Sequence, residues 1–142
     1  MLPRILVTLQ FLIGAALVLT ARPNLSSLGW HLLTVSGVLL SLWAIAAIGW
    51  RRVSVMPQAR DDAELKTSGP YRYVRHPMYS GLLLFCCGLV FTPWHWWKLA
   101  AFVGLVLVLA LKSRIEERLL AQRFPAYPDY ARTTKRFVPF VW

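Results

Sequence analysis

The chain has 142 residues, enough for one domain, with 57% hydrophobic residues, 15% charged residues and a formal net charge of +10. In soluble domains about a quarter of the residues are charged, so this composition disfavours an ordinary soluble domain. Its high hydrophobic content also excludes a disordered chain. The two cysteines are adjacent, Cys86 and Cys87. They cannot form a disulfide framework or a cysteine-rich zinc site.

Four apolar stretches follow one another along the chain, at residues 5–21, 28–50, 78–94 and 96–111. A helix needs roughly 17–25 residues to cross the hydrocarbon core of a bilayer, and the first two stretches satisfy this length. The last two are shorter and predict a tight helical hairpin with its corner at the far interface, where Lys98 extends toward the headgroups. The predicted fold class is an all-α integral membrane protein with four transmembrane helices, followed by a cytoplasmic C-terminal helix and tail.

The first stretch has a second interpretation. Arg4 precedes the apolar run and Thr20-Ala21 ends it, a pattern that resembles a cleaved signal peptide. The run is long for that role, so we favour a retained helix.

The basic residues indicate the orientation of these helices. Of the 16 lysines and arginines, 14 lie near the N-terminus, between the second and third helices, or after the fourth, and Arg22 and Lys98 lie on the opposite side. The positive-inside rule therefore predicts an inner or cytoplasmic membrane location with both termini cytoplasmic. The cytoplasmic segments are then 51–77 and 112–142. This distribution assigns the net charge of +10 to topology and contact with membrane lipids, and disfavours nucleic-acid binding.

The segment before the third helix is rich in groups that a lipid-flanking loop does not need. Ser68-Gly69-Pro70 predicts a turn. Pro77 excludes the α-helical region for His76 and suits the first turn of a helix, so His76 lies at a helix N-terminus that can receive an anion. Tyr79 follows one turn later and shares a face with His76. Alternatively, the tyrosines here are interfacial anchors and the arginines are topology charges.

Two adjacent carboxylates, Glu116 and Glu117, lie where the fourth helix leaves the membrane. One interpretation is a surface salt bridge between Lys112 and Glu116, which are four residues apart. The other is that a carboxylate binds a ligand's ammonium or ribose hydroxyls. Phe124-Pro125 ends this helix, and the remaining tail lies on the interface or folds back to it.

Together these motifs resemble the isoprenylcysteine carboxyl methyltransferase family, which is related to the phospholipid methyltransferases. The residues that carry the resemblance are Gly69 to Gly81, Glu116-Glu117, Phe124, Tyr127 and Tyr130. The resemblance covers residues 65 to about 139, roughly half the chain. It implies a single membrane-embedded domain, residues 1–142, that transfers a methyl group from S-adenosylmethionine to a lipophilic or membrane-associated acceptor. Isoprenylcysteine-type carboxylates, phospholipid amines and thiols all remain open as acceptors.

The resemblance also implies roles for individual residues. The cofactor-binding residues would be Leu65, Lys66, Tyr71, His76, Pro77, Met78, Tyr79, Glu116 and Glu117. The substrate-binding residues would be Lys112, which stands where the family has an arginine, and the nearby Arg114. A lysine lacks the bidentate fork of arginine, so the substrate contact differs here. No residue is assigned as a general base.

Two other functions fit parts of the sequence. Membrane sterol reductases share a similar C-terminal motif region and use NADPH, but they are much longer. A non-enzymatic membrane scaffold would keep the helices, with His76, Tyr79 and Glu116 serving local structure. No metal site is expected, since His31 in the second helix is interpreted as a hydrogen-bonded structural histidine and His95 has no second histidine or carboxylate nearby. The oligomeric state is open, although Gly14, Gly37 and Gly104 allow close helix packing.

Overall fold

The computed structural model describes residues 1–22, 28–49 and 65–139. Within these ranges the secondary structure is helical apart from isolated β-bridges, which confirms the expected all-α class. The elements are α1 (Leu2–Leu19), α2 (Leu28–Ile48), the 3-10 helix η3 (Gly69–Arg72), α3 (Pro77–Val90), α4 (Trp96–Arg123) and α5 (Tyr127–Thr133). Residues 51–64 of the predicted cytoplasmic segment 51–77 lie outside the described residues.

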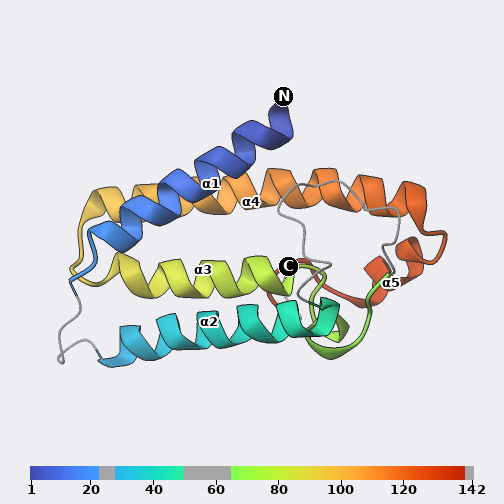
Figure 1. The fold of residues 1–142 in the computed structure, drawn as a ribbon, viewed down its shortest axis with the longest axis horizontal. Coiled ribbons are helices and arrows are strands. Elements are labelled where there is room, and N and C mark those ends of the chain that lie inside the picture. The colour runs from blue at the N-terminus through green and yellow to red at the C-terminus, as the bar shows by residue number, and fades with distance from the viewer. Residues whose placement is uncertain (23–27, 50–64, 140–142) are drawn as a thin grey trace.

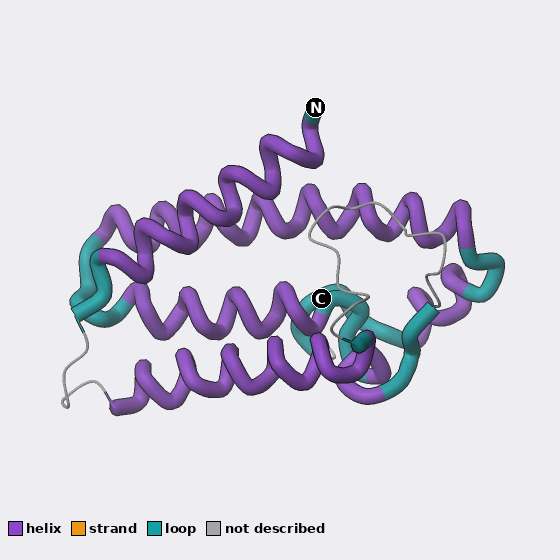
Figure 2. Tube along the Cα trace, viewed as in Figure 1, coloured by secondary structure: helices purple, strands orange, loops and turns teal. Residues whose placement is uncertain are grey.

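The helices form a bundle in which α3 lies between α2 and α4, and α1 runs obliquely across α4 (Figure 1). The short helices η3 and α5 gather at one end, beside the start of α3 and the end of α4 (Figure 2). The connection between α3 and α4 lies at the opposite end, beside the end of α1. The bundle therefore has two distinct ends. We call the end with η3, α5 and the start of α3 the motif end, and the end with the connection between α3 and α4 the hairpin end.

Two helices of the described structure, α1 and α2, are long and apolar enough to cross a membrane. Large apolar side chains such as Leu12, Leu39 and Trp43 are exposed on them, as expected for surfaces that face lipid. Helix α3 is shorter than the predicted stretch 78–94, because it ends at Val90. Helix α4 continues without a break past the predicted stretch 96–111 to Arg123, just before Phe124-Pro125. The four-span topology stays a prediction.

Glycines bring α2 and α3 into close contact. A Cβ atom on Gly81 would overlap the side chain of Ser41, and one on Gly88 would overlap that of Thr34. A Cβ on Gly37 would in turn overlap the backbone at Gly81 and Phe85. Gly37 therefore allows close packing of α2 on α3 within one chain. Gly14 has open space around it, and Gly104 has only an ordinary contact with Ile13.

The core contains residues from α1, α3, α4 and the C-terminal tail. Leu17, Cys86, Leu105 and Leu109 are fully buried there. Phe137 from the tail packs into the same hydrophobic core, so this part of the tail folds against the bundle, while its position relative to the membrane interface stays a prediction. This burial brings residues 134–137 against the start of α3, where the sequence motif lies.

Lys98 corrects the expectation of a side chain that extends to the headgroups. It is completely buried. Its Nζ atom donates hydrogen bonds to the carbonyl oxygens of Thr20 at 3.2 Å, Thr92 at 3.2 Å and Leu89 at 3.4 Å. The last carbonyls of a helix have no partner inside that helix, so satisfying them here outweighs exposing the ammonium to water. Lys98 thereby ties the ends of α1 and α3 to the start of α4.

Candidate functional site

The turn before α3 forms where the sequence predicts it. Gly69 has a φ of +62°, a conformation that glycine adopts without strain, and the 3-10 helix η3 follows. Tyr71 in this helix is buried, and its carbonyl oxygen accepts a hydrogen bond from the Tyr130 hydroxyl at 2.6 Å. Burial raises the pKa of the Tyr130 hydroxyl to about 12, so it stays a donor at neutral pH. This contact joins η3 to α5.

His76 caps the N-terminus of α3, as predicted. Its backbone is not helical (φ −124°, ψ 61°), and Pro77 occupies the first turn. The imidazole is buried and stacks on the Tyr79 ring, with the ring centroids 5.3 Å apart and the planes 3° apart. The prediction that His76 and Tyr79 share a face is confirmed. The stack orients both side chains toward the carboxylates of α4.

Glu117 is the centre of an ion-pair network. Its Oε1 atom accepts hydrogen bonds from Arg75 Nε at 2.9 Å and Arg136 Nε at 3.1 Å, and it lies 3.3 Å from His76 Nε2. Its Oε2 atom accepts a second bond from Arg136 at 2.5 Å. Burial alone would raise the pKa of the Glu117 carboxyl, but hydrogen bonds from His76, Arg136 and Arg75 hold this pKa well below its usual range. Glu117 is therefore an ionised anchor that joins α4, the start of α3 and the tail.

Glu116 has different partners. Its Oε1 atom accepts a hydrogen bond from the Tyr79 hydroxyl at 2.5 Å, and its Oε2 atom lies 3.5 Å from His76 Nδ1. Two guanidinium groups neutralise Glu117, whereas Glu116 pairs with a hydroxyl and an imidazole. Its side chain is 19% exposed, against 15% for Glu117, so the two carboxylates differ in their partners rather than in their burial. Glu116 is thus the better placed of the two carboxylates to bind a cationic group.

The tail is held against the start of α3 by its backbone. Val74 and Lys135 form a parallel β-bridge, and the backbone N–H groups of Arg75 and His76 donate to the carbonyls of Lys135 at 2.8 Å and Arg136 at 3.1 Å. The Arg75 guanidinium also donates to the carbonyls of Ala131 and Thr134. Because these bonds fix the backbone of His76, the tail determines where the imidazole lies.

Lys112 does not form the surface salt bridge considered above. It is buried, and its Nζ atom donates to the side-chain oxygen of Gln10 in α1 at 3.1 Å. The same atom lies 5.1 Å from the centroid of the Tyr79 ring, a cation–π contact. Lys112 therefore extends from α4 toward α1 and Tyr79, on the side of the cluster nearest the apolar helices.

The remaining predicted site residues differ in burial. Leu65 and Met78 are half-buried, whereas Lys66 and Arg114 are exposed. The structure thus brings together His76, Tyr79, Glu116, Glu117 and Lys112. The hydrogen bonds, ion pairs and ring contacts described above for this cluster do not involve the side chains of Leu65, Lys66, Met78 or Arg114.

Sequence reasoning missed the two arginines that bind Glu117. Arg75 was assigned to topology, although its position beside His76 was a usable signal. Arg136 lies far along the chain in the tail, and no local pattern marks it as a partner of Glu117. Burial of Phe137 next to it is what directs Arg136 to the cluster. Among the described residues, no group of three histidine, cysteine or acidic side chains has an arrangement that could hold a metal ion.

Comparison with known proteins finds one matching family and several similar proteins. The profile of the phospholipid methyltransferase family matches residues 27–126, a range that includes His76, Tyr79, Glu116 and Glu117. The chain is 36% identical over 119 residues to a cobalt-zinc-cadmium resistance protein of Cupriavidus metallidurans, covering 78% of this chain and 53% of that protein. It is 32% identical over 116 residues to a nickel-cobalt-cadmium resistance protein of Alcaligenes xylosoxydans xylosoxydans, covering 78% and 54%.

A third relative is named for a reaction. The chain is 30% identical over 121 residues to a methanethiol S-methyltransferase of Crocosphaera subtropica, covering 83% of this chain and 46% of that protein. The chain thus spans about half the length of the curated relatives it matches.

Proposed function

Because the chain belongs to the phospholipid methyltransferase family, we propose that it transfers a methyl group from S-adenosylmethionine to a lipophilic or membrane-associated acceptor. The observation that carries the proposal is the position of Glu116, half-buried between the Tyr79 hydroxyl and the His76 ring at the N-terminus of α3. The relative named as a methanethiol S-methyltransferase supports the same reaction class.

The residues of the motif end fit the chemistry of this cofactor. S-adenosylmethionine supplies an electrophilic methyl group and carries an ammonium, a carboxylate and a sulfonium. Glu116 would pair with the ammonium by charge-assisted hydrogen bonds. The start of α3 would receive the carboxylate, because the positive end of the helix dipole lies there, although the Tyr79 and Ser80 N–H groups already donate to the His76 carbonyl. The Tyr79 ring already lies near the Lys112 ammonium, the kind of contact that a sulfonium makes with an aromatic face.

The surroundings of Lys112 favour an anionic acceptor. Lys112 is a buried cation on the side of the cluster nearest the apolar helices. A thiolate or carboxylate would be attracted there and needs no general base, whereas an amine would be repelled in its charged form. Since a thiol is the acceptor named for the third relative, we place a thiol first, a carboxylate second and a phospholipid amine third.

The proposal includes the membrane arrangement. We propose four membrane-spanning helices, with both termini and the motif end on the cytoplasmic side. The apolar helices α1 and α2 and the clustering of 14 of the 16 basic residues support this orientation. The cofactor would then enter from the cytoplasm and the acceptor from the bilayer.

Binding to the detergent-solubilised chain tests the proposal. We expect saturable binding of S-adenosylmethionine, with NADPH as the comparator, and a clear loss of affinity in the folded His76→Ala variant. His31→Ala is the matched control, since His31 lies in α2 and outside the cluster. Binding of NADPH alone would instead favour a reductase, and unchanged affinity in His76→Ala would remove His76 from the cofactor site. Transfer of a labelled methyl group to a short alkyl thiol and to phosphatidylethanolamine then tests the order of acceptors.

A further inference from the structure

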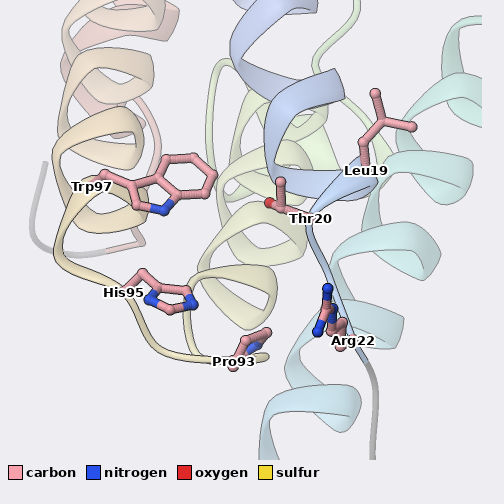
Figure 3. A pocket seen from close by; sticks show the side chains of 6 residues that line it. All are labelled: Leu19, Thr20, Arg22, Pro93, His95 and Trp97. Atoms are coloured by element: carbon pink, nitrogen blue, oxygen red, sulfur yellow. The ribbon is translucent and has the colours of Figure 1, made fainter.

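A cavity lies at the hairpin end, away from the cluster around Glu116. It has a volume of about 350 Å³, within the roughly 300–1,000 Å³ of typical ligand pockets. Figure 3 shows His95 and Trp97 on one side of it and Thr20 and Arg22 on the other. Leu19 and Pro93 complete the lining. The cavity thus lies between the end of α1 and the connection from α3 to α4.

The walls of this cavity are fixed to each other. The buried Lys98 donates to the carbonyls of Thr20 on one side and Thr92 on the other. The backbone N–H of Arg22 also donates to the Thr92 carbonyl at 2.9 Å. These bonds hold the backbones of the two walls in register, and the side chains of Arg22 and His95 extend from them at the surface.

The lining combines nitrogen donors with apolar surfaces. Arg22 presents a guanidinium and His95 an imidazole, and none of the six lining residues is acidic. The Thr20 hydroxyl donates to the Ala16 carbonyl at 2.7 Å, so it is already committed. Guanidinium groups bind phosphate oxygens with paired hydrogen bonds, which makes an anionic oxygen group the ligand that this donor set fits. The side chains of Leu19 and Trp97 would pack against an apolar part of the same ligand.

The neighbouring surface indicates where such a ligand comes from. Trp94 and Trp96 are exposed beside the cavity, with exposed fractions of 50% and 78%. Tryptophan is enriched at the level of lipid headgroups. We propose that the cavity at the hairpin end binds a phosphate group, between Arg22 and His95, carried by a membrane lipid or free in solution. This site is independent of the methyl-transfer proposal, because it shares no residue with the motif end.

Titration of the full chain in neutral detergent tests this site with two probes. The first is short-chain phosphatidylglycerol and the second is inorganic phosphate, each followed by native mass spectrometry or by a change in thermal stability. We expect saturable binding that weakens roughly tenfold in Arg22→Gln and falls further in the double variant with His95→Gln, since each loses a charge-assisted or ring hydrogen bond. Arg4→Gln is the matched control, because Arg4 is an exposed arginine near the other end of α1.

The outcomes of this titration are distinct. Binding of the lipid with no competition by inorganic phosphate identifies a lipid site, and binding of both probes identifies a general phosphate site. Either result supports the proposal when Arg22→Gln weakens it and Arg4→Gln does not. Absence of saturable binding of both probes, or equal weakening by the two arginine variants, overturns it.

Discussion

Each end of the bundle is held by one charged side chain, and the two charges have opposite sign. At the motif end, the Glu117 carboxylate binds Arg75, Arg136 and His76. At the hairpin end, the Lys98 ammonium binds the carbonyls of three residues instead. Because the two guanidinium groups pair with Glu117, the adjacent Glu116 carboxylate is available for another role. Lys98 instead satisfies carbonyl groups at the ends of α1 and α3, and it thereby holds the walls of the hairpin-end cavity together. The motif end is therefore the proposed cofactor site, and Lys98 is a structural clamp.

The strongest way to break this comparison is to remove the charge of Glu117. Glu117→Gln leaves two guanidinium groups without their anion, and removal of one partner from a buried ion pair costs roughly 3–5 kcal/mol. Because the side chain is partly exposed, we expect the free energy of unfolding to fall by about 3 kcal/mol. Denaturant unfolding of the detergent-solubilised chain measures this. A loss below about 1 kcal/mol would show that the network adds little to stability.

The matching change at the hairpin end is Lys98→Met, which keeps an unbranched chain but removes the donor. Three carbonyl groups then lose a partner, and we expect the free energy of unfolding to fall by about 2 kcal/mol. Cofactor affinity should stay unchanged, since the motif end is untouched. Lys135→Met is the control, because that side chain is exposed, and it should change stability by less than about 0.5 kcal/mol. A large loss of cofactor affinity in Lys98→Met would mean that the two ends are coupled.

Low pH distinguishes the two ends, because it protonates Glu117 and does not remove the charge of Lys98. The pKa of Glu117 is lowered in the folded chain, so its stabilising effect is complete above the ordinary pKa of a glutamate, about 4.3, and is lost as the pH falls below that value. The stability difference between the native chain and Glu117→Gln should therefore be constant from pH 7 to about 5. Below about pH 5 this stability difference should narrow by at most about 1.4 kcal/mol per pH unit. A difference that stays constant down to pH 3 would contradict the assignment.

The sequence predicted the local geometry of the motif end because its signals are local, and the roles of these residues toward a cofactor stay predictions. Pro77 dictates the backbone of His76, and the helical repeat places Tyr79 on the same face. The adjacent carboxylates were also found, since charges at a membrane edge are conspicuous. Their different partners were not predictable, because they depend on Arg136, which the fold brings from the tail to Glu117.

Long-range contacts explain the other differences. Lys98 was expected to reach the headgroups, but the carbonyls that bind it belong to α1 and to the end of α3, whose positions depend on tertiary packing. Lys112 was considered as a partner of Glu116 four residues away, yet its hydrogen bond goes to Gln10 in the first helix. In both cases a local rule was overridden by a partner far away in the sequence.

The most direct test of the central claim is the affinity for S-adenosylhomocysteine, the demethylated product, measured by calorimetry on the native chain and two variants. Glu116→Gln keeps an acceptor for the Tyr79 hydroxyl but loses the charge that would hold the ligand's ammonium, and Asp129→Asn makes the same change at an exposed site. We expect Glu116→Gln to weaken binding roughly tenfold or more and Asp129→Asn to leave it unchanged. Equal affinities in the two variants, or no saturable binding to the native chain, would contradict the claim that Glu116 binds the cofactor.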